Sequence, residues 1–194
     1  MSISLVAGLG NPGREYENTR HNIGFAVIDA FARQRGLAWK SQSQFEALTA
    51  RWDAAPGRTF VLAKPQTYMN DSGRSVRALA AFYKIEPSSV VVIYDDLNID
   101  LGLVKVTTHG SAGGHNGVAS LLDLVGDGFV RYRIGTGPKQ PPQMDLKDFV
   151  LGKFTPDQQT VIDQKIDTFV SGLALVLEQG PDRAMNTLNR RETK

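Results

Sequence analysis

The side chains that could do chemistry in this chain are histidines and carboxylates, because cysteine is absent. The 194 residues include 3 His and 0 Cys, which excludes thiol nucleophiles, disulfides and Cys-based zinc sites. His21 lies where a polar segment meets the start of a predicted helix, and Asp95 ends an apolar run in which an acid has no packing role. An imidazole oriented by a carboxylate can act as a general base toward water. We expect this chemistry from His21 and Asp95, with capping or surface roles as the alternative for each.

Three asparagines strengthen this expectation. Asn11, Asn70 and Asn116 each stand at the edge of a glycine-rich or polar turn. An amide does not ionise or attack at neutral pH, but it can bind a carbonyl, position water or donate a hydrogen bond to an oxyanion. Each asparagine alone is also typical of a turn. Together with a histidine and an aspartate at loop edges, they indicate a hydrolytic site.

Other catalytic arrangements lack their sequence signatures. No His pair has the helical spacing of a zinc site, and no G-x-S-x-G motif is present. Residues 8–13 match the dinucleotide fingerprint G-x-G-x-x-G, but the polar stretch 14–18 follows where a helix should begin. The acid about 20 residues further on would be Asp29, which falls inside a predicted helix rather than at a strand end. We therefore expect neither a metal nor a cofactor, and a dinucleotide-dependent enzyme is the less favoured alternative.

The hydrophobic pattern interleaves strands with helices. Strands are predicted over residues 4–9, 45–52, 59–63, 90–94, 103–107 and 130–134, and helices over 23–36, 71–83, 118–125 and 156–176. Gly180 and Pro181 are expected to end the last helix before a short basic tail. This order predicts an α/β fold, a three-layer sandwich whose mixed, mostly parallel central sheet has helices on both faces. Ligands in such folds bind beyond the carboxyl ends of the strands, where Asn11, Asp95 and residues 110–117 follow.

Length and composition predict one globular domain over residues 1–194, with 41% hydrophobic and 22% charged residues. No apolar run reaches the ~18 residues of a membrane span, and residues 1–6 lack the features of a secretion signal. We therefore expect a cytoplasmic protein without membrane association. The net charge of +2 does not by itself indicate a nucleic-acid binder. The period of a strand nevertheless places Arg131 and Arg133 on one face, near Lys105 on the preceding strand, so we expect a basic strand face there.

Separate segments of the chain together carry a resemblance to a known family. They are residues 8–13 (GLGNPG) with 19–24 (TRHNIG), residues 64–73 (KPQTYMNDSG), residues 94–97 (YDDL) and residues 113–117 (GGHNG). In this order and at these spacings they resemble the bacterial peptidyl-tRNA hydrolase family. The match runs from the first predicted strand to the C-terminal helix, which makes it far more specific than a single glycine motif.

The resemblance implies a monomeric esterase that needs no metal or cofactor. Its substrate would be prematurely released peptidyl-tRNA, from whose 3′ end the peptide is removed so that the tRNA is recycled. By the same resemblance, His21 is the catalytic base, Asp95 is its orienting partner, and Asn11 is an amide that acts near the reacting water. Asn70 and Asn116 bind substrate near the scissile ester.

Further residues are implied in binding the tRNA. The cleft for the terminal adenosine or the peptide would be lined by Tyr16, Tyr68, Met69 and His115. Arg133 corresponds to one residue of a clamp on tRNA phosphate. At the other clamp position Thr107 stands where some members of the family carry lysine, and Lys105 is expected to compensate. A non-catalytic RNA-binding relative is the main alternative function.

Overall fold

The computed structural model describes residues 2–190 of the chain. Its seven strands are β1 (Ser2–Gly8), β2 (Lys40–Gln42), β3 (Ala47–Ala55), β4 (Arg58–Pro65), β5 (Val90–Asp96), β6 (Val104–Thr107) and β7 (Val130–Gly135). The α-helices of these residues are α1 (Ile23–Gln34), α2 (Ser72–Tyr83), α3 (Asn116–Leu124), α4 (Leu146–Leu151), α5 (Pro156–Gln179) and α6 (Pro181–Leu188).

All seven strands form one mixed sheet in the order β2-β3-β4-β1-β5-β7-β6. The central strands β4, β1, β5 and β7 run parallel to one another, while β3 and β6 are antiparallel to their neighbours. Central parallel strands are buried on both faces and therefore read as continuous apolar runs, as residues 90–94 do. The predicted mixed, mostly parallel sheet is confirmed.

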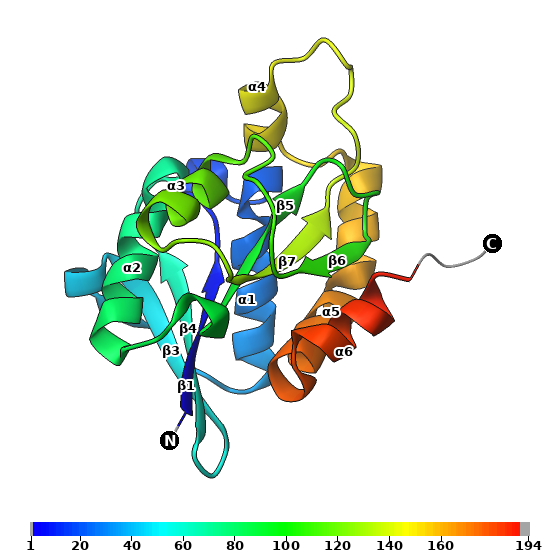
Figure 1. Cartoon of the computed structure of the whole chain (residues 1–194). Coiled ribbons are helices and arrows are strands. Elements are labelled where there is room, and N and C mark those ends of the chain that lie inside the picture. The colour runs from blue at the N-terminus through cyan, green and yellow to red at the C-terminus, as the bar shows by residue number, and fades with distance from the viewer. Residues whose placement is uncertain (1, 191–194) are drawn as a thin grey trace.

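Helices cover both faces of the sheet (Figure 1). Alternate side chains of one strand point to opposite faces, so Val6 and Ile93 pack with α1, α5 and α6, whereas Ala7 and Val92 pack with α2 and α3. These two apolar cores, one on each side of the sheet, confirm the predicted three-layer sandwich.

Three elements were not predicted: β2, α4 and α6. The helices α4 and α6 span 6 and 8 residues, too short for a clear helical period. The expectation of a tail directly after Gly180 was wrong, because Pro181 begins a new helix. Proline lacks the N–H that would continue the preceding helix, and its fixed φ suits the first position of the next helix. Residues 191–194 of the expected tail lie outside the described part of the chain.

Glycines allow α1 to approach the sheet closely. A Cβ on Gly24 would collide with the carbonyl oxygens of Leu9 and Ile93, and one on Gly8 would lie 2.5 Å from the carbonyl oxygen of Gly24. The start of α1 therefore rests on the carboxyl ends of β1 and β5. The 3₁₀ turn Arg20–Asn22, which leads into α1, is brought to the same edge of the sheet.

Within residues 2–190, no helix has both the length and the apolar character needed to cross a membrane.

Candidate active site

A pocket of about 680 Å³ opens at the carboxyl ends of the parallel strands. Its walls come from the segments that follow β1, β4 and β5, from the turn before α3, and from α4. In Figure 1, α4 lies beyond the end of the sheet toward which β5 points. The location is the one expected for a ligand site in an α/β sheet.

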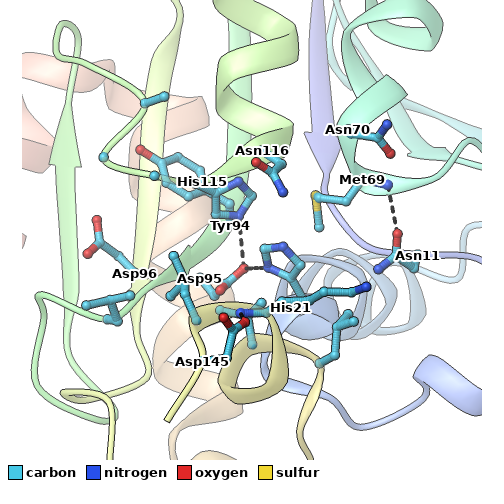
Figure 2. A pocket seen from close by; sticks show the side chains of 18 of the residues that line it. Asn11, His21, Met69, Asn70, Tyr94, Asp95, Asp96, His115, Asn116 and Asp145 are labelled. Atoms are coloured by element: carbon cyan, nitrogen blue, oxygen red, sulfur yellow. Dashed lines mark hydrogen bonds and ion pairs between the residues drawn. The ribbon is translucent and has the colours of Figure 1, made fainter. Parts of the chain in front are cut away.

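His21 and Asp95 meet in this pocket. Nδ1 of His21 lies 2.8 Å from Oδ1 of Asp95, and the residues are only 5% and 4% exposed. His21 comes from the turn before α1 and Asp95 from the end of β5 (Figure 2). Nε2 of His21 has no hydrogen bond to any described residue. A histidine whose Nδ1 faces a carboxylate and whose Nε2 is free has the geometry of a general base.

A second imidazole contacts the same carboxylate oxygen. Nε2 of His115 lies 3.0 Å from Oδ1 of Asp95, and Nδ1 of His115 accepts a hydrogen bond of 3.3 Å from the backbone N–H of Val118. The rings of His21 and His115 are 4.6 Å apart between centroids. Figure 2 shows the two rings converging on Asp95 from different segments of the chain.

These neighbours keep Asp95 ionised. Burial by itself would raise the pKa of the Asp95 carboxyl, but interactions with His115 and His21 outweigh burial and lower that pKa far below its ordinary value. The carboxylate can therefore hold a proton on Nδ1 of His21, which leaves the lone pair of Nε2 available.

Asn11 is held by two sets of hydrogen bonds. Its side-chain oxygen accepts from the backbone N–H of Met69 at 2.7 Å, and its backbone N–H and carbonyl both bond to the side chain of Asn22, each at 2.9 Å. The oxygen of the amide is therefore occupied, and Nδ2 is the donor left for the pocket. Asn22 was missed at the sequence level, where an asparagine beside a helix start looks like a cap.

The remaining predicted pocket residues divide into two groups. Residues that line the pocket are Tyr68, Met69, Asn70, His115 and Asn116. Tyr16 does not line it and instead lies edge-on to Tyr68, with 6.4 Å between the ring centroids. Tyr68 is 58% exposed, so its ring is accessible from the pocket.

The basic strand face is smaller than expected. Lys105 and Arg133 are register partners on β6 and β7, outside the pocket, and Nη2 of Arg133 lies 2.8 Å from Oδ2 of Asp96. The prediction that Arg131 belongs to an exposed basic face was wrong, since Arg131 is only 1% exposed. Its guanidinium donates to the carbonyl oxygens of Gly110 and Ser111, so it anchors the glycine-rich segment internally. A buried arginine is tolerated because the fold supplies these acceptors.

Arg20 connects the 3₁₀ turn Arg20–Asn22 to α4. Its guanidinium donates to the carbonyl oxygens of Phe149 and Lys153 at 3.2 and 3.0 Å, and to the side chain of Gln158 at 2.8 Å. The pocket wall formed by α4 includes Leu146. No local sequence pattern predicts this role for Arg20, because its partners lie about 130 residues away along the chain.

The chemistry of the pocket residues bears on two alternative ligands, a metal ion and a dinucleotide. His21, Asp95 and His115 offer ligand atoms within 4.8 Å of one another, but the Val118 N–H on Nδ1 of His115 favours a proton on Nε2, the nitrogen that would have to bind the metal. The loop after β1 does not open a helix at its glycines, because α1 begins only at Ile23. Asp29 itself lies within α1 rather than on a strand, and its carboxylate is paired with Nζ of Lys64 at 2.6 Å. The residues of the pocket therefore fit neither a metal ion nor a dinucleotide.

Known proteins share the sequence and the fold of this chain. A family model described as peptidyl-tRNA hydrolase matches residues 5–194. A protein from Gloeobacter violaceus with that name is 42% identical over 98% of this chain and 96% of its own, and one from Aquifex aeolicus is 43% identical over 99% of each. The crystal structure of the peptidyl-tRNA hydrolase from Acinetobacter baumannii superposes with a TM-score of 0.88 at 36% identity, covering 96% of this chain and 94% of that chain.

Proposed function

The chain belongs to the peptidyl-tRNA hydrolase family, and on that premise we propose that it cleaves the ester between peptide and tRNA with water activated by His21. The observation that carries this proposal is the 2.8 Å contact between Nδ1 of His21 and Oδ1 of Asp95 inside the pocket. The product tRNA re-enters translation. The proposal includes action as a monomer in the cytoplasm, and both of these remain predictions.

The proposed reaction begins with a water molecule near Nε2 of His21. Asp95 accepts the Nδ1–H bond, Nε2 takes a proton from the water, and the water oxygen attacks the carbonyl carbon of the ester. When the tetrahedral intermediate collapses, the bond to the ribose oxygen breaks and that oxygen takes the proton from Nε2. The products are a tRNA with its hydroxyl restored and a peptide carboxylic acid, which releases the second proton of the water to solvent and becomes a carboxylate. General-base catalysis of this kind contributes ~10²–10⁴-fold.

Amide donors complete the proposed machinery. Nδ2 of Asn11 is the leading donor for water or the oxyanion, because the oxygen of the same amide is already bonded to Met69. Asn116 and Asn70 line the same pocket and are exposed, so they can reach substrate. One oxyanion donor is typically worth ~3 kcal/mol.

Aromatic and basic side chains are assigned to the rest of the tRNA. Tyr68, supported edge-on by Tyr16, offers an exposed ring for stacking with the terminal base or a peptide side chain. Met69 forms the adjacent apolar wall of the pocket. Lys105 and Arg133 are proposed to contact phosphate near the acceptor end, because they lie side by side on β6 and β7.

The deciding experiment is release of labelled peptide from an N-blocked aminoacyl-tRNA. His21→Ala is expected to lose at least ~10²-fold in kcat while tRNA affinity is retained. His109→Ala is the matched control, because the His109 side chain is 77% exposed and does not line the pocket. Unchanged turnover in His21→Ala would remove His21 from the mechanism. A wild-type protein that binds tRNA without turnover would favour the non-catalytic RNA-binding alternative.

A further inference from the structure

One carboxylate oxygen of Asp95 serves two imidazoles. Oδ1 lies 2.8 Å from Nδ1 of His21 and 3.0 Å from Nε2 of His115. The base proposed above uses only the first contact. The second contact, from His115, connects the turn before α3 to the same oxygen atom. The family resemblance gives His115 only a place in the substrate-binding wall.

The start of α3 determines which nitrogen of His115 carries the proton. His115 is the N-cap of α3, and its Nδ1 accepts the backbone N–H of Val118. In a neutral imidazole one nitrogen accepts and the other donates. With Nδ1 occupied as the acceptor, Nε2 holds the hydrogen and donates it to Asp95. The helix cap thus sets the tautomer.

We propose that His115 is a positioning residue for the Asp95–His21 pair, acting through the Nε2–H bond to Oδ1 of Asp95. This inference rests on the proposed function, because it assigns a partner to the base of that reaction. Two donors from different segments fix the rotation of the carboxylate, and so the direction in which Asp95 presents its oxygen to His21. Both nitrogens of His115 are engaged, so only its ring face is left for substrate.

Sharing Oδ1 also has an electrostatic consequence. An oxygen that accepts a second hydrogen bond is a weaker partner for the imidazolium form of His21. Tyr94 and Asp96 on β5 and Asp145 and Lys147 at α4 line the same pocket, yet of the described side chains only the two histidines hydrogen bond to Asp95. Loss of the His115 donor should therefore favour protonation of His21 and shift the acid limb of activity to higher pH.

Two amide substitutions separate this role from a simple helix cap. In His115→Asn, the short side chain can still accept the Val118 N–H, since asparagine is a good N-cap, but it cannot reach Asp95. In His115→Gln, the amide nitrogen occupies roughly the place of Nε2 and can donate to Oδ1, while the cap is weakened. Both variants remove the imidazole, and thermal melting checks that each remains folded.

The measurement is the pH profile of kcat/KM for peptidyl-tRNA hydrolysis, which reports groups of the free enzyme. His115→Asn is expected to shift the acid limb upward by about 0.5–1 pH unit, the size that a typical hydrogen bond supports, and to lower kcat by ~10-fold. His115→Gln is expected to keep the limb of the wild type. An unshifted limb in His115→Asn, or equal shifts in both variants, overturns the proposal.

The tautomer provides a test that does not depend on activity. Nitrogen NMR of the wild-type protein is expected to find the proton of neutral His115 on Nε2 and none on Nδ1. A proton on Nδ1 overturns the proposal even if both variants are impaired. Failure of the proposed function would appear differently, as full turnover in His21→Ala, and would leave the NMR result on His115 intact.

Discussion

Replacing Asp95 with asparagine keeps the shape of the side chain but removes its charge. In the wild type, the carboxylate oxygen accepts hydrogen bonds from Nδ1 of His21 at 2.8 Å and from Nε2 of His115 at 3.0 Å. In the variant, the amide must face both of these nitrogens. If its NH₂ group turns toward His21, Nδ1 must become the acceptor and the proton moves to Nε2. That tautomer cannot take a proton from water. If its oxygen turns toward His21, the hydrogen bond survives without the charge.

The expected loss can be estimated from the geometry. Deprotonation of water leaves an imidazolium on His21 beside the carboxylate. With about 4 Å between charge centres and an effective dielectric constant of about 20, their attraction is about 4 kcal/mol. That energy corresponds to ~10³-fold in rate, which lies within the range of general-base catalysis. We therefore expect Asp95→Asn to lower kcat by ~10³-fold.

The assay is single-turnover release of labelled peptide from N-blocked aminoacyl-tRNA, with tRNA affinity measured in parallel. The matched control is Asp96→Asn, which removes the same charge one residue away, where the carboxylate bonds Arg133 rather than His21. Asp96→Asn is expected to change KM more than kcat. An Asp95→Asn enzyme whose kcat stays within about tenfold of the wild type would refute the assigned role, as would an equal kcat loss in the control.

Two further predictions concern the surroundings of the site. Arg20→Lys retains the charge, but an ammonium group cannot reach the three acceptors that the guanidinium reaches in two directions. The amide hydrogens of α4 should therefore exchange faster, and KM should rise more than kcat falls. Unchanged exchange in Leu146–Leu151 would contradict the anchoring role. Arg133→Ala should weaken tRNA binding and reduce the slope of log K against log salt by about 1. An unchanged slope would remove Arg133 from phosphate contact.

The layered architecture was predictable because it depends on hydrophobic periodicity within short segments. The continuous apolar run of β5 indicates a strand that is buried on both faces, and β5 and β7 both lie where they were predicted. The short α4 was not predictable in this way. Its six residues are held by Arg20 across more than 120 residues of chain, a contact that leaves no periodic pattern.

The error at Arg131 has a related cause. A charged residue in a strand usually marks an exposed position, and alternation correctly placed Arg131 and Arg133 on the same face. Exposure, however, depends on what lies over that face. The carbonyl oxygens of Gly110 and Ser111 bury one guanidinium, whereas Arg133 reaches Asp96 at the edge of the pocket. Those acceptors belong to a loop whose position a single sequence does not reveal.

The sequence by itself determined the family, the layered fold and the set of chemical groups: a histidine, an aspartate and asparagines at loop edges. These depend on residue identity, order and local pattern. The tertiary structure alone decided how the groups meet, since His21 and His115 lie 74 and 20 residues from Asp95 and still bond to one of its oxygen atoms. A hydrogen bond requires two atoms within about 3 Å and in line, and only the packing of α1 and α3 around the end of β5 brings both rings to that distance.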